Sequence, residues 1–443
     1  MTRQALLTDV ASDVRIGIVG AGASGLTAAH YLAKAGYEDV ILFERRRQAG
    51  GKCDSIIVND RVYEMGAVFG APNYELIRDL TARVGLEEGS CPPSHFYSPQ
   101  GRRTALFPWH RTPFLLWQLF AKLAWLTANK YRDIYQPGLA GIHPDLFQNF
   151  EEFTAGHRLA ELPALFQPIA TGFGYGYAEQ VPAAYMLKYL SWPMIMDCAR
   201  GKGTIWPHGV QTVWERLSHE HDVLLGVDIK RVTRGENIVV TTDKKRFVLD
   251  YLILACPLDN ALSFLDATAE ERDLFSRIRS YDYWVLLSKI EGLPRDIGFV
   301  RANFAAQNQG HLMLWYCRWP QTRLYTLYVL GDFQTSQDLI EANCAADLQR
   351  LGASLNKVLA VRRWRYFPHV NTADMAAGFY EKLEAMQGRR RTFYCGEIMS
   401  FSTLECSARY ARDLVTRFFH DQKTHPKLVE DIHPPVIKST LSA

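Results

Sequence analysis

The sequence predicts an α/β protein in which a Rossmann-type dinucleotide-binding domain is joined to an antiparallel-sheet domain and a helical insertion. Three observations lead to this expectation. An apolar strand over residues 15–19 runs into a glycine-rich turn at 20–25, and a helix follows at once. Near the other end, a buried strand over 392–395 precedes a Gly-Glu pair and a helix over about 405–419. Between them, residues 286–369 alternate strand-like runs with one helix, which is typical of a sheet backed by helices.

The glycine-rich turn has the spacing Gly20-x-Gly22-x-x-Gly25. Gly20 permits the tight turn, Gly22 lets the backbone approach a pyrophosphate, and Gly25 lets the helix pack closely on its strand. Phosphates are then expected at the helix N-terminus, where free N–H groups and the helix dipole favour negative charge. A second apolar strand, over 40–43, ends at Glu44, whose carboxylate is expected to accept hydrogen bonds from ribose hydroxyls.

The cofactor is predicted to be FAD rather than NAD. The doublet Gly50-Gly51, followed by Lys52, can bring bare backbone against a ligand that extends past its ribose, although a solvated surface turn fits equally well. The order of elements resembles that of two-domain flavoproteins of the amine oxidase and phytoene desaturase type. That resemblance implies that Gly396-Glu397 holds the ribityl and pyrophosphate region. It also implies that the last helix points its N-terminus at the flavin pyrimidine, where the dipole stabilises the reduced ring. The residues expected to contact the cofactor are Gly20, Gly22, Ala23, Ser24, Gly25, Glu44, Arg45, Gly50, Gly51, Lys52, Gly66, Ala67, Val227, Gly396, Glu397, Thr403 and Leu404.

Composition argues against several other classes of function. The formal net charge of the 443 residues is +3, which does not suit a nucleic-acid-binding surface. The eight cysteines are scattered without a CxxC pair or histidine partners at ligand spacing, so we expect no metal site and a reducing cytoplasm. No export signal is visible, and no uncharged apolar run reaches the roughly 18–20 residues that span a bilayer. The sequence therefore predicts a cytoplasmic enzyme.

The cofactor domain is expected to be discontinuous, comprising residues 1–75, 203–285 and 370–443. Two insertions carry the rest. The first, over 76–202, is an aromatic-rich helical segment that is expected to form part of the substrate site or a lid. The second, over 286–369, is expected to be an antiparallel-sheet substrate domain.

Within the helical insertion, Thr112 and Pro113 open a strongly apolar helix, FLLWQLFAKLAWLTANKY. Thr112 suits the N-cap, and Pro113 suits the first helical position. Apolar residues cover nearly the whole circumference and are interrupted mainly by Gln118 and Lys122. Burial between domains is the first interpretation, and peripheral contact with a membrane surface is the alternative.

Four segments resemble the polyunsaturated fatty acid double-bond isomerases. They are TGFGYGYAEQVPAAYMLKYL at 171–190, YEMGAVFGAPNYELI at 63–77, WPHGVQTVWERL at 206–217, and a C-terminal run over 365–419 that begins RYFPHVNTADM. The likeness extends over about residues 15–419 and includes the substrate-binding segments. It implies a flavin amine-oxidase fold, with FAD as cofactor and a long-chain polyunsaturated fatty acid as substrate. Those enzymes move a double bond by passing hydride from an allylic carbon to flavin N5 and returning it to another carbon of the same chain.

Such a reaction requires an apolar, water-free channel and no general base of its own. The sequence shows no persuasive Ser-His-Asp set or carboxylate pair, and His369 is expected to be a packed or surface histidine rather than a base. Trp192 and Tyr175 are the candidates for lining the channel and stabilising positive charge, and Trp192 falls where the resembling family carries an aromatic gate. Ordinary core packing is the alternative for most of the aromatic set, of which about two are expected to touch substrate. The set comprises Phe173, Tyr175, Tyr177, Tyr185, Tyr189 and Trp192.

The sequence departs from that family at the substrate head group. Sliding an acyl chain along a uniform tunnel changes little buried area, so a charge-assisted hydrogen bond of about 1.5–3 kcal/mol to the carboxylate is needed to choose the reacting carbon. The family's anchoring arginine is expected in the loop after Leu86, where this chain has Ser94 and His95 instead. Arg102 and Arg103 follow closely. His95, Arg102 and Arg103 are therefore the candidate anchors.

Two other functions fit the same sequence. An FAD-dependent oxidase or dehydrogenase on this fold, acting on an amine, a terpenoid or another lipid, would pass the hydride to oxygen or another acceptor instead of returning it. A non-catalytic lipid carrier that keeps FAD as a structural relic is a third class. The residues and the resemblance together favour isomerisation of a long-chain unsaturated fatty acid, with a lipid as the small-molecule partner and no nucleic acid.

Overall fold

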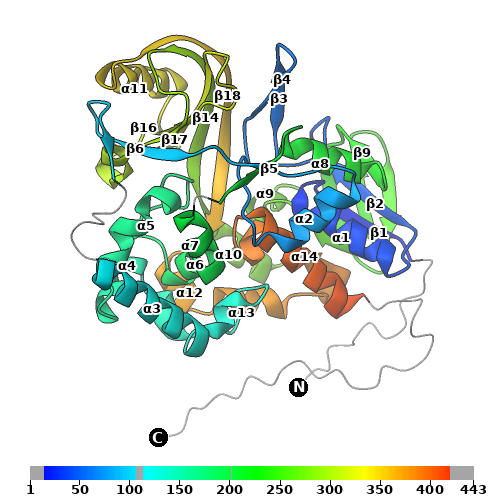
Figure 1. Cartoon of the computed structure of the whole chain (residues 1–443). Coiled ribbons are helices and arrows are strands. Elements are labelled where there is room, and N and C mark those ends of the chain that lie inside the picture. The colour runs from blue at the N-terminus through cyan, green and yellow to red at the C-terminus, as the bar shows by residue number, and fades with distance from the viewer. Residues whose placement is uncertain (1–13, 106–112, 201, 420–443) are drawn as a thin grey trace, which may run out of the picture.

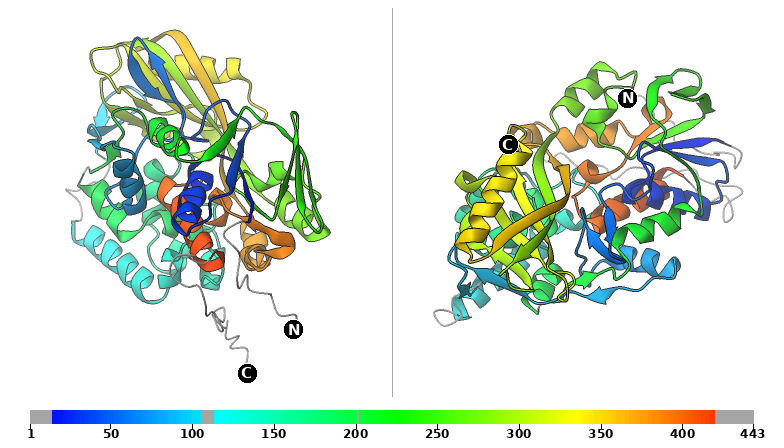
Figure 2. Two further views of the ribbon diagram at one scale, coloured as in Figure 1. Left: turned by 90° about the vertical axis from the view of Figure 1, so that its right-hand side faces the viewer. Right: turned by 90° about the horizontal axis from the view of Figure 1, so that it is seen from above.

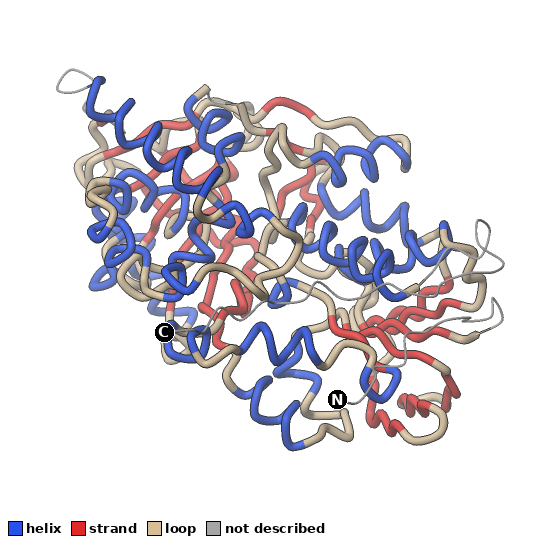
Figure 3. The backbone as a smooth tube through the Cα atoms, turned by 90° about the horizontal axis from the view of Figure 1, so that it is seen from below, coloured by secondary structure: helices blue, strands red, loops and turns tan. Residues whose placement is uncertain are grey.

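A computed structural model describes the chain over residues 14–105, 113–200 and 202–419. Three parts are visible in Figure 1. A parallel sheet with its covering helices lies at the right, a larger sheet stands at the upper left, and a group of helices lies below the larger sheet (Figure 1). Figure 3 shows the same separation from below, with the helical group at the left and the parallel strands at the right.

The parallel sheet has five strands in the order β19-β13-β1-β2-β9. They are β1 (Ile16–Val19), β2 (Val40–Glu44), β9 (Asp222–Leu225), β13 (Tyr251–Leu254) and β19 (Thr392–Tyr394). The helices around it are α1 (Ala23–Lys34), α8 (Val210–Ser218) and α14 (Leu404–Phe418). The central strand β1 is buried along its whole length, as expected where both faces of a parallel sheet are covered. The order strand, glycine turn, helix, strand confirms the Rossmann-type prediction.

A small antiparallel sheet accompanies the parallel one. Its strands are β10 (Ile229–Arg234), β11 (Ile238–Thr242) and β12 (Arg246–Leu249), shown in green in the left view of Figure 2. Phe247 of β12 packs edge-on against Phe43 of β2, with ring centroids 5.0 Å apart. The contact covers apolar residues of β2 and confirms the short β segments expected before the return to β13.

The larger sheet has seven strands in the order β18-β14-β17-β16-β15-β6-β7. They are β6 (Ser94–Tyr97), β7 (Arg103–Thr104), β14 (Arg279–Glu291), β15 (Ile297–Val300), β16 (Leu312–Tyr316), β17 (Leu324–Gly331) and β18 (Ser354–His369). Helix α11 (Gln337–Arg350) covers one face, at the top of Figure 1. One apolar cluster lies between α11 and the sheet, and a second lies on the opposite face, toward the cofactor domain. That inner face is one wall of the candidate site.

The strands expected within residues 286–369 pair antiparallel, as predicted. β6, which lies outside that range, joins β15 in parallel near the edge of the sheet. β6 and β7 also belong to the first insertion, which the sequence predicts to be helical, and the expected boundary at residue 286 falls inside β14. β6 pairs with β15, about two hundred residues later in the chain, and among the described strands β7 pairs only with β6, so the short sequence patterns of these two strands give little sign of them. The three-part division of the chain stays a prediction.

The helical group and the remaining elements complete the described chain. The helices are α2 (Glu75–Arg83), α3 (Pro113–Asn129), α4 (Phe150–Gly156), α5 (Leu162–Ala170), α6 (Ala183–Tyr189), α7 (Trp192–Ala199), α9 (Leu258–Ala261), α10 (Ala269–Ser276), α12 (Thr372–Ala376) and α13 (Phe379–Ala385). The short strands are β3 (Ser55–Val58), β4 (Arg61–Glu64), β5 (Gly89–Ser90) and β8 (Thr204–Ile205). The main apolar core runs from the parallel sheet into this helical group without a break.

Helix α3 is exposed along one side, which corrects the expectation that it is buried between domains. Its leucine face packs inward, and its aromatic face does not. Buried residues are Leu119, Leu123 and Leu126, whereas Phe114, Trp117 and Trp125 are 67%, 65% and 63% exposed. The N-cap expected at Thr112 lies outside the described residues. No described helix is long and apolar enough to cross a membrane.

Candidate active site

The N-terminus of α1 is suited to receive an anion. The helix begins at Ala23 after Gly22, with no side-chain cap and no acidic residue in its first turn, so its first N–H groups, that of Ser24 included, remain available to a ligand. Gly25 is required by packing, because a Cβ there would lie 1.9 Å from the Gly20 carbonyl oxygen. Gly20 itself has a φ of +106°, which favours glycine. This turn fits the pyrophosphate of a dinucleotide.

Glu44 ends β2 with its side chain buried and held by backbone donors. Its Oε2 accepts a hydrogen bond from the Ala21 N–H at 2.9 Å, and its Oε1 accepts one from the Arg46 N–H at 2.8 Å. Each carboxylate oxygen has a second lone pair, so the group keeps acceptor capacity for ribose hydroxyls. Val227 donates its N–H to the Glu44 carbonyl at 2.9 Å and lies beside the strand end, whereas the Arg45 side chain is exposed.

The glycine doublet packs against the glycine-rich turn. Gly50 donates its N–H to the Ala21 carbonyl at 2.9 Å, and a Cβ on Gly51 would lie 3.1 Å from the Gly22 Cα. The guanidinium of Arg46 fixes the loop from outside, since its Nη1 donates to the Gly51 carbonyl at 2.6 Å. The doublet therefore lies beside the N-terminus of α1, which favours a role next to the cofactor over an ordinary surface turn.

Lys52 connects this loop to the C-terminal Gly-Glu pair. Its Nζ lies 2.6 Å from Oε2 of Glu397, and the same oxygen accepts a hydrogen bond from Ser402 Oγ at 3.1 Å. Behind the lysine, Ala67 donates its N–H to the Lys52 carbonyl at 2.9 Å, and a Cβ on Gly66 would lie 1.9 Å from that oxygen. Segments from both ends of the chain thus meet at one side chain.

Helix α14 begins at Leu404 and is capped by Thr403, whose Oγ1 accepts a hydrogen bond from the Cys406 N–H at 3.2 Å. Glu405, the acidic residue in the first turn of α14, caps the N-terminus of α2 rather than its own helix. Its carboxylate accepts hydrogen bonds at 3.2 and 3.1 Å from N–H groups in the first turn of α2. Burial raises the pKa of Glu405.

Together these residues fit an extended dinucleotide such as FAD. The glycine cradle has no room for a Cβ at Gly25, the first turn of α1 offers N–H donors, and Glu44 offers acceptors. Lys52 and Glu397 add a charged pair beside the glycine doublet, where a ligand that extends past its ribose would lie. These donors and acceptors therefore fit the phosphates and ribose hydroxyls of an extended dinucleotide.

Tyr175 lies at the centre of a buried aromatic cluster. Its ring centroid is 4.7 Å from those of Tyr189 and Phe401, and its hydroxyl is 3.3 Å from that of Tyr366. The Lys52 ammonium lies 5.3 Å above the Tyr366 ring, so the cluster adjoins the Lys52–Glu397 pair. Burial raises the pKa of Tyr175 and of Tyr366, so both hydroxyls stay protonated.

The other aromatic candidates lie outside this cluster. Phe173 and Tyr177 pack on the inner face of the larger sheet. The Tyr185 hydroxyl lies 2.6 Å from that of Tyr380, a buried contact typical of a structural role. Trp192 begins α7 and is 40% exposed, so it lies at the surface rather than among the buried rings.

His369 is a packed histidine. Its ring lies 4.8 Å from that of Phe367 and 5.0 Å from that of Tyr281, and its Nδ1 is 2.8 Å from the Phe367 carbonyl oxygen. Burial lowers the pKa of His369 to about 4, so the imidazole is neutral near pH 7. Its environment suits packing between rings rather than proton transfer.

The candidate head-group anchors lie at the β6–β7 edge of the larger sheet. His95 Nδ1 lies 2.8 Å from Oδ2 of Asp296, Arg103 Nη2 lies 3.4 Å from the same oxygen, and Tyr97 donates its hydroxyl to it at 2.6 Å. Arg102 is exposed. Because Asp296 already pairs with His95 and Arg103, the geometry does not favour these two as anchors of a substrate carboxylate.

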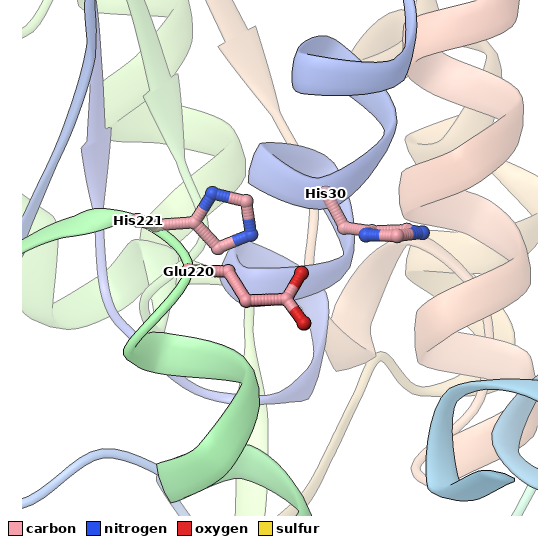
Figure 4. Close-up of side chains that lie close together, drawn as sticks. All are labelled: His30, Glu220 and His221. Atoms are coloured by element: carbon pink, nitrogen blue, oxygen red, sulfur yellow. The ribbon is translucent and has the colours of Figure 1, made fainter. Parts of the chain in front are cut away.

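One group in the described part of the chain has the composition of a metal site. His30 of α1 and the successive residues Glu220 and His221 offer ligand atoms that all lie within 4.8 Å of one another (Figure 4). Glu220 already pairs with Arg83, whose Nη2 lies 2.8 Å away. The members come from distant parts of the chain, so sequence spacing does not reveal the group. That the protein uses no metal stays a prediction.

Comparison with known proteins agrees with this geometry. The sequence model of the flavin-containing amine oxidoreductase family matches residues 23–405. The beta-cyclopiazonate dehydrogenase of Aspergillus oryzae is 24% identical over 420 residues, which cover 87% of this chain and 89% of that protein. The crystal structure of a CLA-producing fatty acid isomerase from P. acnes has a TM-score of 0.88 and 35% identity, covering 93% of this chain and all of that one. A putrescine oxidase structure, 18% identical with a TM-score of 0.69 over 90% of this chain and 97% of its own, shares the fold. The chain therefore belongs to the flavin-containing amine oxidoreductase family and is an FAD-dependent enzyme.

Proposed function

We propose that this enzyme isomerises the double bonds of a long-chain polyunsaturated fatty acid, with no net oxidation. One observation carries the proposal. The 35% identity with the fatty acid isomerase extends over 93% of the chain and therefore includes the larger sheet and the helical group as well as the cofactor domain. The nucleotide-binding residues alone are common to oxidases, dehydrogenases and isomerases, so similarity in the other parts is what separates the classes.

FAD would be held by the residues described above. Its pyrophosphate would lie at the first turn of α1, its ribose at Glu44, and its ribityl region beside Gly396 and Glu397, with Thr403 and the start of α14 near the pyrimidine. When bound, the flavin supplies a two-electron acceptor and donor, so a hydride removed from one carbon of the substrate can be returned to another. A reaction of this kind consumes no second substrate.

The protein's own contribution is a dry aromatic wall. Tyr175, Tyr189 and Phe401 exclude water, and their faces can stabilise positive charge on a delocalised allylic carbon chain. No base is needed for hydride removal. The site suits this, because burial keeps the Tyr175 and Tyr366 hydroxyls protonated and His369 is packed between rings.

Net oxidation is the second candidate, favoured by the similarity to a dehydrogenase and an amine oxidase. Anaerobic incubation of the yellow holoenzyme with linoleic acid and related polyunsaturated acids separates the two. An isomerase converts many equivalents to isobaric products and accumulates no bleached flavin, whereas a dehydrogenase stops after one equivalent with its flavin reduced. A carrier protein would leave both lipid and flavin unchanged. Either of the last two results would contradict the proposed isomerisation.

We also propose that α3 mediates peripheral contact with a membrane surface, from which a lipid substrate could be taken up. Phe114, Trp117 and Trp125 expose large aromatic faces on one side of this helix, and Trp117 and Phe114 stack on each other with centroids 6.2 Å apart. Tryptophan is favoured at the boundary between water and lipid, because its ring is apolar and its N–H is not. Helix α3 contains one lysine and no acidic residue, which suits an anionic surface.

A further inference from the structure

A small cavity lies beside the first two turns of α14. Its volume is about 70 Å³, and its walls come from α14, from residues 73–74 before α2, from the segment 134–137, and from the junction of α6 and α7. The anchors that the sequence predicts, His95, Arg102 and Arg103, lie elsewhere, at the β6–β7 edge. The cavity is instead next to Trp192, because Ser191 and Met194 are among its lining residues.

Two cations line this cavity. Arg409 is half-buried on α14, and its side chain makes no ion pair or hydrogen bond with the part of the chain that the structure describes. Lys188 is 8% exposed, and its ammonium donates to the carbonyls of Gln136 and Gly138, the latter at 2.8 Å. An ammonium has three N–H groups, so one remains for a ligand.

The single acidic residue in the lining already has partners. Glu405 directs its carboxylate to N–H groups of α2, as described above, and its charge also interacts with that of Arg409. The lining has two basic groups and one acidic group. Burial, together with the nearby positive charge of Arg409, lowers the pKa of Lys188 to about 8, so an anion bound beside this ammonium would stabilise its charged form. The described lining of the cavity therefore has one more basic group than acidic groups, which favours an anionic ligand.

The cavity and the aromatic cluster share a residue, Tyr189. Tyr189 and Thr403 belong to the cavity wall, and Tyr189 stacks on Phe401 with ring centroids 5.4 Å apart and lies 4.7 Å from Tyr175. Thr403 is the N-cap of α14, the helix whose start is expected to face the flavin. A chain with its polar end beside Arg409 would pass Tyr189 on its way to the reacting ring.

We propose that this cavity binds the carboxylate of a free long-chain fatty acid, which Arg409 and Lys188 hold by charge-assisted hydrogen bonds. The assignment rests on the proposed function in that it takes the substrate to be an acid. In this assignment Arg409 of α14 takes the role of the anchoring arginine that the resembling family carries in the loop after Leu86. Because the carboxylate is fixed at one end, the distance along the chain decides which double bond meets the flavin.

The test compares a saturated long-chain fatty acid with its methyl ester, using the holoenzyme. Both bury the same chain, and only the acid carries the charge. Binding is followed by the change in flavin absorbance, so the readout needs no turnover. Arg409→Gln is expected to weaken binding of the acid by about 10-fold or more and to leave binding of the ester unchanged. Arg412→Gln is the matched control, since Arg412 is on the same helix and does not line the cavity.

Each outcome decides the assignment. Equal acid affinity in the wild type and in Arg409→Gln would overturn it, as would an equal loss for acid and ester, or the same loss in Arg412→Gln. Flavin content, measured on every variant, shows whether the protein has folded. If the wild type binds the acid through Arg409 but does not isomerise any polyunsaturated acid, the anchor stands and the proposed function fails. If it isomerises acid and ester alike with equal affinity, the function stands and the anchor fails.

Discussion

Lys52 and Glu397 are 345 positions apart in the chain, and their side chains meet at 2.6 Å. The pair joins the glycine doublet, which follows the second strand, to the Gly-Glu pair after the last strand. Both side chains are about a quarter exposed, at 23% and 25%. An ion pair of this exposure contributes about 1 kcal/mol or less to folding. Its main consequence is therefore to hold two cofactor-binding loops in register.

Breaking this pair is expected to weaken FAD binding more than folding. Lys52→Met should lower the affinity of the apoprotein for FAD by about 5-fold to 10-fold, equivalent to about 1 kcal/mol, with little change in the melting temperature. Flavin fluorescence during reconstitution measures the affinity. Arg323→Met is the control, because it removes a 2.5 Å pair with Glu291 of β14, on the larger sheet. Unchanged affinity in Lys52→Met would contradict the role assigned to the pair.

Gly25→Ala should abolish flavin binding and destabilise the protein. The added Cβ would lie 1.9 Å from the Gly20 carbonyl oxygen, which is backbone and can move only if the turn opens. Overpacking typically costs about 1–3 kcal/mol, and a contact with backbone that cannot move aside lies at the upper end of that range. The ratio of flavin to protein absorbance and the melting temperature check both effects. Gly156→Ala is the control: nothing lies within 4 Å of its added Cβ, so the variant should be as stable or slightly more stable. If the Gly25→Ala protein still binds flavin and is yellow, α1 can move away from the Gly20 carbonyl, and the prediction is wrong.

The cofactor end of the site could be predicted from the sequence because its residues act locally. The turn at Gly20, the start of α1 and the carboxylate of Glu44 are fixed by a few neighbouring positions and one strand pairing. The register of β1 on β2 places Phe43 beside Val19, so Glu44 follows directly at the sheet edge where the turn lies. At this site the residues that are close in sequence are therefore also the ones that the β1–β2 pairing brings together in space.

The substrate side could not be predicted in the same way. Aromatic residues between 173 and 192 look alike in sequence, yet only Tyr175 and Tyr189 join Phe401 and Tyr366 in the cluster beside Lys52. Their selection depends on where β18 ends and where the loop before α14 lies, which no local pattern encodes. The sequence does not single out Phe401 or Tyr366, although both lie in the segment that carries the family resemblance.

The exposure of α3 and the position of β6 have the same cause. An all-round apolar helix is expected to be buried, but only the face with Leu119 and Leu123 finds neighbours. Likewise, the residues around His95 form a strand because β15 offers a free edge. In both cases the neighbouring elements determine whether the segment is buried or forms a strand, and a single sequence does not reveal which elements those are.

His369 makes stability depend on pH. Its pKa is about 4 in the folded protein and 6.5 in the unfolded chain, so between these values the unfolded state binds the proton and the folded state does not. The free energy of unfolding should therefore fall as pH is lowered from 7 to 5, by on the order of 2 kcal/mol from this residue. Urea unfolding at pH 5 and pH 7 measures the difference. His369→Asn should reduce that difference, whereas replacing the exposed His208 by Asn should not. An identical pH slope in both variants would rule out His369 as the source.

The exposed face of α3 predicts binding to anionic vesicles. Trp117 and Trp125 are 65% and 63% exposed, and each indole that inserts into the interface removes apolar area from water at about 25 cal/mol per Å². The double variant Trp117→Ser, Trp125→Ser should reduce co-sedimentation with vesicles containing phosphatidylglycerol by at least 10-fold, while flavin content and turnover of a detergent-dispersed fatty acid stay unchanged. Phe333→Ser is the matched control, because Phe333 is a 48% exposed aromatic residue that follows β17 of the larger sheet and does not belong to α3. The proposal fails if the wild type does not sediment with the vesicles, or if Phe333→Ser loses as much binding as the tryptophan variant. In that case the aromatic face of α3 is not a membrane contact, and another protein surface is the remaining candidate to cover it.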